Sequence, residues 1–290
     1  MEKGLASATI SIVDKSSALN GRESINRNDS MFPDVPAETK PENAVLNSKV
    51  DDGVRVISID EYKEAARCLA EAFEHDDVAR YFVDTPDRAH WTAKQKWDLH
   101  VSIMEYVTYA HCLKGLVTTV GPNYGAVALW MPPGKNMDDL YTIFRSGLWR
   151  LNYKLSAEGK KRFFTEFLPL LHDTKHSILG HRDDSAWYLV YIGTRPCSTG
   201  KGYARKLIEN VTRTADREAR ACYLESSNDV NPKIYQKFGF EVKRKIHLQR
   251  AEKGVELDIM GLIRKPGALE MGALALLDDR VEAASWMDWW

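Results

Sequence analysis

The stretch WYLVYIGTRPCSTGKGYA, Trp187–Ala204, decides the fold of this 290-residue chain. Its first six residues are apolar or aromatic without alternation, which predicts a strand buried on both faces at the centre of a sheet. Gly193, Thr194 and Pro196 are expected to break the hydrogen-bond ladder of that strand. The rest of the chain is therefore interpreted as support for this central strand.

A turn containing two glycines follows the strand. Gly200 and Gly202 allow the backbone to turn tightly and a ligand to approach closely. Beyond Gly202, apolar residues recur at spacings of three and four, which predicts an amphipathic helix. A strand, such a turn and a helix N-terminus direct several N–H groups at one place, as phosphate sites require. A plain tight turn is the alternative, because neither a Walker loop nor a complete dinucleotide fingerprint is present.

A second strand, turn and helix follow at residues 221–240. ACYLES, residues 221–226, has the composition of a strand. Asn231 suits the N-cap of a helix, Pro232 suits its first position, and Gly239 suits the residue just past its end. These residues predict a helix of about two turns.

The first segment resembles motif A of the GNAT superfamily of N-acyltransferases, a loop of pattern Q/R-x-x-G-x-G/A that holds the pyrophosphate of acetyl-CoA. Thr199, Gly202 and Ala204 stand at the signature positions, with Gly200 and Lys201 between them. Thr199 departs from the Gln or Arg of the family. Main-chain amides supply most of the phosphate contacts in this loop, so the departure leaves the anchoring to them.

The second segment resembles motif B of the same superfamily, N-x-x-x-Y-x-x-x-G-F, with Tyr235, Gly239 and Phe240 at its fixed points. The resemblance implies that Tyr235 protonates the departing CoA thiolate. The alternative is a tyrosine whose ring packs on the core. Glu225, at the end of its strand, is the candidate general base, with a surface carboxylate or a salt bridge as the alternative.

The resemblance also implies acetyl-CoA as cosubstrate and no metal. The residues expected to bind the cosubstrate are Tyr191, Ile192, Gly193, Thr194, Thr199, Gly200, Lys201, Gly202, Tyr203, Ala204, Asn231 and Tyr235. Acetyl transfer is expected by direct attack of the amine in a ternary complex, so Cys197 and Cys222 need not act.

The fragment ALWMPPG, residues 128–134, ends the second strand of a hairpin predicted over Leu116–Val120 and Tyr124–Met131. With its spacing to the central strand, it resembles a GNAT branch similar to puromycin N-acetyltransferase and its fungal relatives. That resemblance places Trp130 near the acceptor, and a core anchor at a strand end is the alternative. Ser226 is a second candidate contact to the acceptor.

The expected fold is α/β, a central twisted mixed sheet flanked by helices, with a helical insertion between the third and fourth strands. The expected domains are a loosely ordered extension over 1–50, the acetyltransferase domain over 51–266 with its insertion at about 137–181, and a C-terminal extension over 267–290. The domain is predicted to open with a strand over Val54–Ile59, a helix capped by Asp60 and a longer helix from about His90 to Cys112. The aromatic residues of the insertion either line an apolar pocket or form its own core; they are Tyr141, Phe144, Trp149, Tyr153, Phe163 and Phe164.

The composition of the chain bears on its binding partners and its location in the cell. A net charge of −1 and a pI near 6.7 give no electrostatic footprint for nucleic acid or an anionic membrane. Four scattered cysteines suit a reducing compartment, and no apolar run reaches the roughly 18 residues of a membrane span. A cytoplasmic monomer or homodimer is expected, with the nucleus not excluded. The expected function is N-acetylation of a small-molecule amine, such as an antibiotic, toxin or metabolite; the alternatives are a protein or peptide acetyltransferase and a non-catalytic acyl-CoA-binding module.

Overall fold

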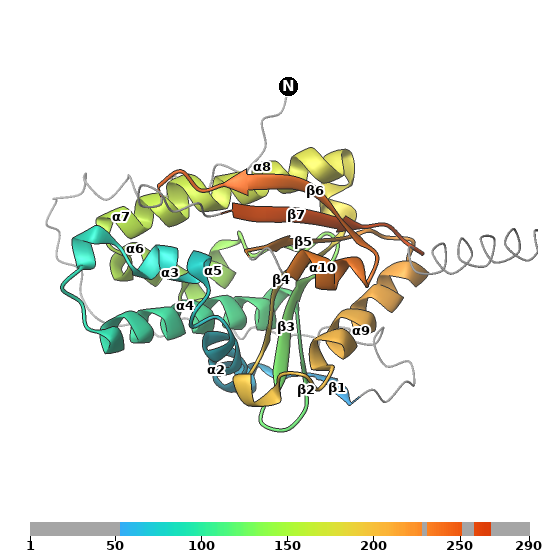
Figure 1. Cartoon of the computed structure of the whole chain (residues 1–290), viewed down its shortest axis with the longest axis horizontal. Coiled ribbons are helices and arrows are strands. Elements are labelled where there is room, and N and C mark those ends of the chain that lie inside the picture. The colour runs from blue at the N-terminus through green and yellow to red at the C-terminus, as the bar shows by residue number, and fades with distance from the viewer. Residues whose placement is uncertain (1–52, 228–230, 251–257, 268–290) are drawn as a thin grey trace, which may run out of the picture. The chain divides into compact units, whose positions relative to one another are not determined.

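The computed structural model describes residues 53–227, 231–250 and 258–267, which belong to one compact unit of the chain (Figure 1). Seven strands of this unit form one sheet in the order β1-β2-β3-β4-β5-β7-β6. Their bounds are Val54–Val56 (β1), Leu116–Val120 (β2), Ala126–Met131 (β3), Trp187–Thr194 (β4), Cys222–Ser226 (β5), Phe240–His247 (β6) and Asp258–Arg264 (β7). All neighbours are antiparallel except β4 and β5, so the predicted mixed sheet is confirmed.

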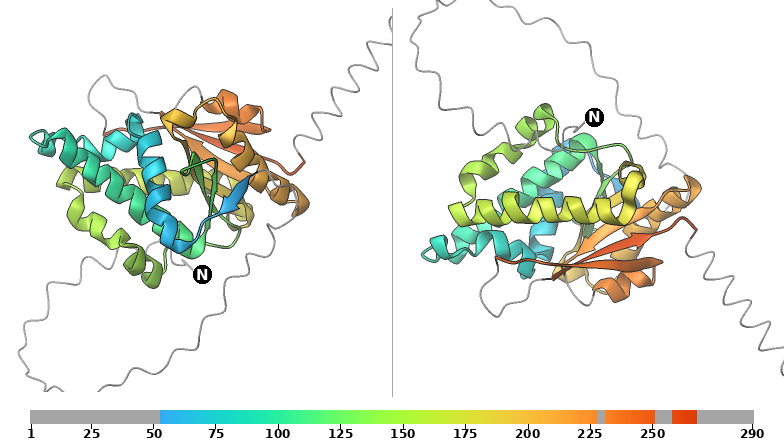
Figure 2. Two further views of the ribbon diagram at one scale, coloured as in Figure 1. Left: turned by 90° about the horizontal axis from the view of Figure 1, so that it is seen from below. Right: turned by 90° about the horizontal axis from the view of Figure 1, so that it is seen from above.

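Helices cover both faces of the sheet. The α-helices are α2 (Tyr62–Ala72), α3 (Asp77–Val83), α4 (Ala93–Lys114), α5 (Leu140–Ser146), α6 (Leu151–Lys154), α7 (Ala157–Lys160), α8 (Leu168–Leu179), α9 (Tyr203–Arg217) and α10 (Asn231–Gln236). Shorter helical turns are η1 (Ile59–Glu61), η2 (Pro86–Arg88), η3 (Leu148–Arg150), the π-helical η4 (Lys161–Phe167), η5 (Gly180–Ser185) and η6 (Pro196–Ser198). Figure 2 shows α2, α4 and α8 on one face of the sheet and α9 on the other.

The main core lies between the sheet and the helices α2 and α4. Val127 and Leu129 of β3 pack there, with the apolar faces of both helices. Periodic apolar residues specify this packing, because Ala65, Ala66 and Leu69 recur on one face of α2 and are all buried. The predicted opening of the domain, a strand followed by an amphipathic helix, is therefore confirmed.

Several predicted bounds differ from the structure. β1 ends at Val56, because Ser58 rather than Asp60 begins the next element, through a capping box with Glu61. The hairpin turn is longer than predicted: β3 begins at Ala126, and Asn123 and Tyr124 take φ values of 52° and 55°. Turn geometry of this kind leaves little trace in hydrophobic patterning.

The helical insertion between the third and fourth strands is confirmed. It runs from α5 to η5, and α7, η4 and α8 follow one another without a break between Ala157 and Leu179. The first helix of the insertion is short, since α5 stops at Gly147 in a left-handed conformation (φ 83°).

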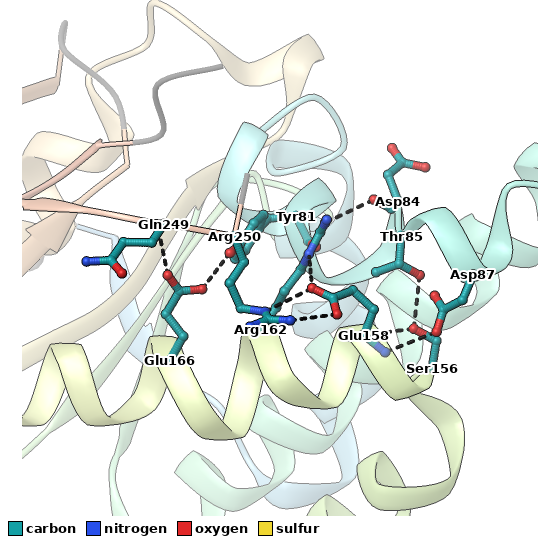
Figure 3. A network of polar contacts seen from close by, with 11 residues as sticks. Tyr81, Asp84, Thr85, Asp87, Ser156, Glu158, Arg162, Glu166, Gln249 and Arg250 are labelled. Atoms are coloured by element: carbon teal, nitrogen blue, oxygen red, sulfur yellow. Dashed lines mark hydrogen bonds and ion pairs between the residues drawn. The ribbon is translucent and has the colours of Figure 1, made fainter. Parts of the chain in front are cut away.

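A polar network attaches this insertion to the rest of the chain (Figure 3). The buried guanidinium of Arg162 donates to the carbonyls of Tyr81 and Asp84 at 2.9 and 3.2 Å. Arg250, beyond the end of β6, forms a two-pronged pair with Glu158, with both N···O distances 2.9 Å. The insertion is thus fixed to the α3 segment on one side and to the end of β6 on the other.

Candidate active site

A β-bulge in β4 sets the geometry of the site. Leu189 pairs with Trp130 and Tyr191 with Leu129, so Val190 has no partner residue on β3. An extra residue of this kind reverses the alternation of side chains beyond it. As a result Tyr188, whose ring packs on Tyr223, and Tyr191, whose ring packs on Phe73 just after α2, both face the α2 and α8 side of the sheet.

β4 and β5 diverge at this bulge. Their parallel ladder joins Trp187–Leu189 to Cys222–Leu224 and ends there. Beyond it β4 remains paired with β3 as far as Thr194, and β5 remains paired with β7 as far as Ser226. In the described part of the chain, the edge of β4 from Val190 onward therefore has no strand on its β5 side. An extended ligand can add to such an edge by main-chain hydrogen bonds.

The prediction that Gly193 and Thr194 break the ladder is wrong. Gly193 pairs with Val127 and Thr194 with Ala126. Packing explains the glycine at position 193 instead, because a Cβ there would lie 2.7 Å from the Cβ of Ala72 on α2. The absence of a side chain at this position allows α2 to pack closely against the sheet.

The turn after β4 leaves open space for an anion. Gly200 and Gly202 take positive φ values of 80° and 72°, and a Cβ built on either meets no atom within 4 Å. Gly202 is the N-cap of α9, a helix of 15 residues. The first N–H groups of a helix have no intrahelical acceptors, and the helix dipole favours negative charge at this end. The loop from Thr199 to Ala204 thus fits a diphosphate group.

Two side chains of this loop are engaged within the protein. The hydroxyl of Thr199 donates to the carbonyl of Arg195 at 3.4 Å, a long hydrogen bond. The ring of Tyr203 packs on the β2–β3 turn, where a Cβ on Gly121 would lie 2.4 Å from its Cε2. Lys201 lies with its Nζ 6.0 Å from the centre of that ring. Main-chain amides are therefore the chief donors that the loop offers.

Glu225 is the strongest candidate for a general base. Burial raises the pKa of its carboxyl to about 7, although the hydroxyls of Tyr188 and Tyr223 and the charge of Lys175 favour the ionised form. Its Oε1 is enclosed without a hydrogen bond of normal geometry among the described residues. A carboxyl with this pKa is partly ionised near neutral pH and can accept a proton there.

Tyr235 lies on the other face of the sheet. Arg264 of β7 pairs with Cys222 and Phe240, and its guanidinium bonds Asp216 of α9 at 2.6 and 2.8 Å, so this register position faces α9. The ring of Tyr235 contacts that of Phe240, with centroids 5.9 Å apart. Strand alternation then places Glu225, three residues after Cys222, on the opposite side.

The Tyr235 side chain is 9% exposed, and burial raises the pKa of its phenol to about 12. It therefore remains protonated at neutral pH, as a proton donor must. Asn231 begins α10, the short helix that carries Tyr235, and the predicted turn after it is present, since Gly239 has a φ of 81°.

Trp130 and Ser226 are placed differently from the prediction that they contact the acceptor. Trp130 is fully buried and packs edge-on against Trp187, with ring centroids 6.5 Å apart, so it is the core anchor of the alternative interpretation. Ser226 is 4% exposed and alternates with Glu225, which directs it to the α9 face.

Other predicted residues meet at the divergence of the strands. Tyr191, Ile192 and Thr194 follow the bulge on β4, and Glu225 is the first residue of β5 beyond the shared ladder. Of the two cysteines near the site, Cys197 is exposed in η6, and burial raises the pKa of the Cys222 thiol to about 12.

Some neighbours of the site were missed from the sequence. The hydroxyl of Ser227 bonds Asp76, the N-cap of α3, at 2.5 Å, and burial raises the pKa of the Asp76 carboxyl. Arg195, at the end of β4, donates to Glu71 of α2 at 2.6 Å. Neither pair is close in sequence, and no spacing within one element signals it.

Among the described residues no group of His, Cys, Asp and Glu is arranged to hold a metal ion. None of the helices there is long and apolar enough to cross a bilayer.

Relatives define the class of the protein. No family model matches the chain. An uncharacterized N-acetyltransferase of the fission yeast Schizosaccharomyces pombe is 49% identical over 207 residues, which cover 71% of this chain and 80% of the relative. The protein is therefore an N-acetyltransferase. It belongs to the GNAT family, whose mixed seven-stranded sheet with flanking helices is the fold described above.

Solved structures of other N-acetyltransferases are similar to the chain at low identity. Arylalkylamine N-acetyltransferase 2 from Aedes aegypti is 17% identical with a TM-score of 0.48, over 73% of this chain and 97% of that one. The PaiA N-acetyltransferase from Thermoplasma acidophilum, solved in complex with coenzyme A, is 9% identical with a TM-score of 0.39, over 73% and 97%.

Proposed function

We propose that this protein transfers the acetyl group of acetyl-CoA to the amine of a small molecule by direct attack in a ternary complex. The observation that carries the proposal is Glu225, a carboxyl with a pKa of about 7 at the point where β4 and β5 diverge. An amine is charged at neutral pH and must lose a proton before it attacks a thioester. Glu225 accepts that proton, directly or through a water molecule.

Main-chain groups of the same region hold the cosubstrate. Residues Thr199–Ala204 bind its diphosphate through N–H groups at the start of α9, and the open edge of β4 pairs with its extended pantetheine arm. A backbone N–H near Ile192 or Gly193 polarises the thioester carbonyl as negative charge develops on its oxygen. Acetyl-CoA supplies the activated acyl group.

Tyr235 donates the proton that the leaving thiolate takes up. Its phenol is protonated at neutral pH because burial raises its pKa to about 12. Neither cysteine near the site is needed as a nucleophile, and the Cys222 thiol in particular stays protonated near neutral pH.

The acceptor is proposed to be a small amine because the insertion, which is fixed to α3 and to the end of β6 (Figure 3), packs through α8 on β6 and β7. This packing covers the Glu225 side of the sheet. Ile178 of α8 lies 2.9 Å from a Cβ built on Gly261, next to the hydroxyl of Tyr223. An amino-bearing antibiotic similar to puromycin, a toxin and a metabolite are the acceptor types that the sequence resemblance suggests.

A thiol-release assay tests the proposal. Purified protein and acetyl-CoA are mixed with a panel of arylalkylamines, polyamines, puromycin and lysine-containing peptides, and free CoA is measured. Turnover with small amines that falls in Glu225→Gln but not in Glu241→Gln, an exposed carboxylate on β6, supports the proposal. Turnover with peptides alone indicates a protein acetyltransferase, and acetyl-CoA binding without any turnover indicates a non-catalytic module.

A further inference from the structure

Five large apolar side chains are exposed on the segment from α5 to α6. They are Leu140, Tyr141, Phe144, Trp149 and Tyr153, with Phe144 71% and Tyr153 80% exposed. Three of them form one continuous surface, because the ring of Phe144 stacks on that of Trp149 at 5.7 Å and the ring of Trp149 meets that of Tyr153 edge-on at 6.0 Å. A contiguous apolar surface of this kind marks a binding site more often than scattered exposed residues do.

This surface is separate from the proposed active site. α5 and η3 pack on α4, α6 packs on η3, and α4 in turn packs on α2 and the sheet. Both views in Figure 2 place the segment on the outer side of α4, away from β7. Phe163 and Phe164 pack against the main core of the domain, whereas Tyr141, Phe144, Trp149 and Tyr153 are exposed.

The same segment is strongly basic. Residues 140–156 include Arg145, Arg150 and Lys154 and no carboxylate. Arg145 donates to the hydroxyl of Tyr109, Lys154 donates to Ser102, and Arg150 lies over the Tyr106 ring. Within the described residues, none of these three exposed cations pairs with a carboxylate. The aromatic residues and these cations together are called the basic aromatic patch.

The occupant of this patch must be acidic and apolar. Residues 268–290 of the same chain carry five carboxylate side chains against one arginine, and also Trp286, Met287, Trp289 and Trp290. The tryptophan side chains can pack on the stacked rings of the patch, and the carboxylates can pair with its unpaired cations. We propose that residues 268–290 dock on the basic aromatic patch of their own chain.

The 268–290 segment is long enough to reach the patch. It contains 23 residues after Gly267, the last described residue, and an extended chain spans up to about 75 Å over that length. A compact body of roughly 215 residues has a radius of gyration of about 17 Å, so every face of it lies within reach.

Two other occupants fit less well. A second copy that used the same patch would bring Arg145, Arg150 and Lys154 against their equivalents, which repel one another. Residues 1–52 carry Phe32 as their single aromatic side chain and no tryptophan. Only the 268–290 segment combines excess negative charge with several large rings.

Site-specific photo-crosslinking in the full-length chain tests the docking. p-Benzoylphenylalanine replaces Tyr153, and the crosslinked peptides are identified by mass spectrometry; the same probe at Val242, which is 40% exposed on β6, is the control. The expected result is a crosslink from position 153 to residues 268–290 in a product of monomer mass, and none to that segment from position 242. Crosslinks that miss 268–290, a product of dimer mass, or no crosslink overturns the proposal.

Charge reversal tests the complementarity. Asp278→Lys, Asp279→Lys and Glu282→Lys are combined in the chain that carries the probe at position 153. The crosslink yield to 268–290 is expected to fall at least fivefold, while far-ultraviolet circular dichroism and the melting temperature of the domain stay unchanged. A yield that is unaffected contradicts charge-driven docking. Arg150→Glu, on the patch side, is expected to reproduce the loss without any change in the 268–290 segment.

Discussion

Glu225 lies on the α8 face of the central sheet, and Tyr235 lies on the α9 face. Arg264 of β7 pairs with Cys222 of β5 and with Phe240 of β6, so the side chains of these three residues lie on the same face of the sheet. Glu225 is three residues after Cys222 on β5, so its side chain lies on the other face. The proposed base, Glu225, and the proposed acid, Tyr235, thus lie on different faces of the sheet. Each is expected to control its own proton transfer, so the two can be tested independently.

Replacing Glu225 should remove the acidic limb of the pH–rate profile. The wild-type kcat/KM is expected to rise with pH through about 7, because the carboxyl must be ionised to accept a proton. Glu225→Gln should lower kcat/KM by about a hundredfold to ten-thousandfold and abolish that limb. Initial rates of CoA release between pH 5.5 and 9 give the comparison. If the limb persists in the variant, another group is the base.

The same substitution should stabilise the folded protein at alkaline pH. The folded-state pKa of Glu225, about 7, lies above its ordinary value of 4.5, so the folded state binds a proton more tightly than the unfolded state. The free energy of unfolding therefore contains a favourable contribution below pH 4.5 that is lost as the pH rises through about 7. Urea unfolding at pH 5 and pH 8 is expected to show a smaller decline for Glu225→Gln than for the wild type. An equal decline in both proteins would mean that the carboxyl does not titrate in this range.

Tyr235→Phe should slow the reaction by about ten- to a thousandfold while leaving acetyl-CoA binding nearly unchanged. The substitution removes only the hydroxyl, and the ring contact with Phe240 is retained. The expected loss is in kcat. An acyl donor with a more acidic leaving thiol should restore part of the lost rate, because its thiolate leaves without protonation by a general acid. A variant with an unaltered pH–rate profile and unaltered kcat excludes Tyr235 as the acid.

The sequence predicts the turns around the candidate site better than it predicts contacts between distant elements. The turn around Gly200 and Gly202 is specified locally, because positive φ angles and a helix start require particular residue types at fixed positions. The same is true of the turn at Gly239 after α10. Local rules of this kind can be read from a single sequence.

The features that a single sequence does not reveal depend on partners far along the chain. The bulge at Val190 has no residue signature, yet it turns Tyr188 and Tyr191 to the same face and starts the divergence of β4 from β5. The sequence leaves two interpretations of Trp130 open, an acceptor contact and a core anchor, and its burial against Trp187 favours the core anchor. Burial of Glu225, which raises its pKa, likewise depends on distant segments, since α8 packs next to Gly261, the partner of Glu225 on β7.

Gly202→Ala tests whether the turn ahead of α9 binds the cosubstrate. The φ of 72° at Gly202 is unfavourable for alanine by about 1–2 kcal/mol, so the loop of the variant is expected to relax to another conformation. The Kd for acetyl-CoA is then expected to rise by about five- to thirtyfold. Isothermal titration calorimetry measures the change. Gly134→Ala is a matched control, because Gly134 has a similar φ of 70° and equally open surroundings but lies outside the loop. Equal effects of the two substitutions on the Kd would refute a role of the turn in binding.

The pair of Arg250 and Glu158 should make stability depend on pH in the acid range. Arg250 lowers the pKa of the Glu158 carboxyl below its ordinary value, and Arg162 adds to the effect. A carboxyl with a lowered folded-state pKa contributes stability that is present above its unfolded pKa of about 4.5 and is lost as the pH falls through the folded value. Arg250→Ala is therefore expected to destabilise the protein at pH 7 and to have less effect the further the pH falls below 4. Urea unfolding of the wild type, Arg250→Ala, Glu158→Gln and the double variant forms a double-mutant cycle for this pair. The coupling energy should be present at pH 7 and should decline toward pH 3. A coupling energy that does not vary with pH would show that the contact between Arg250 and Glu158, drawn in Figure 3, does not depend on the charge of Glu158.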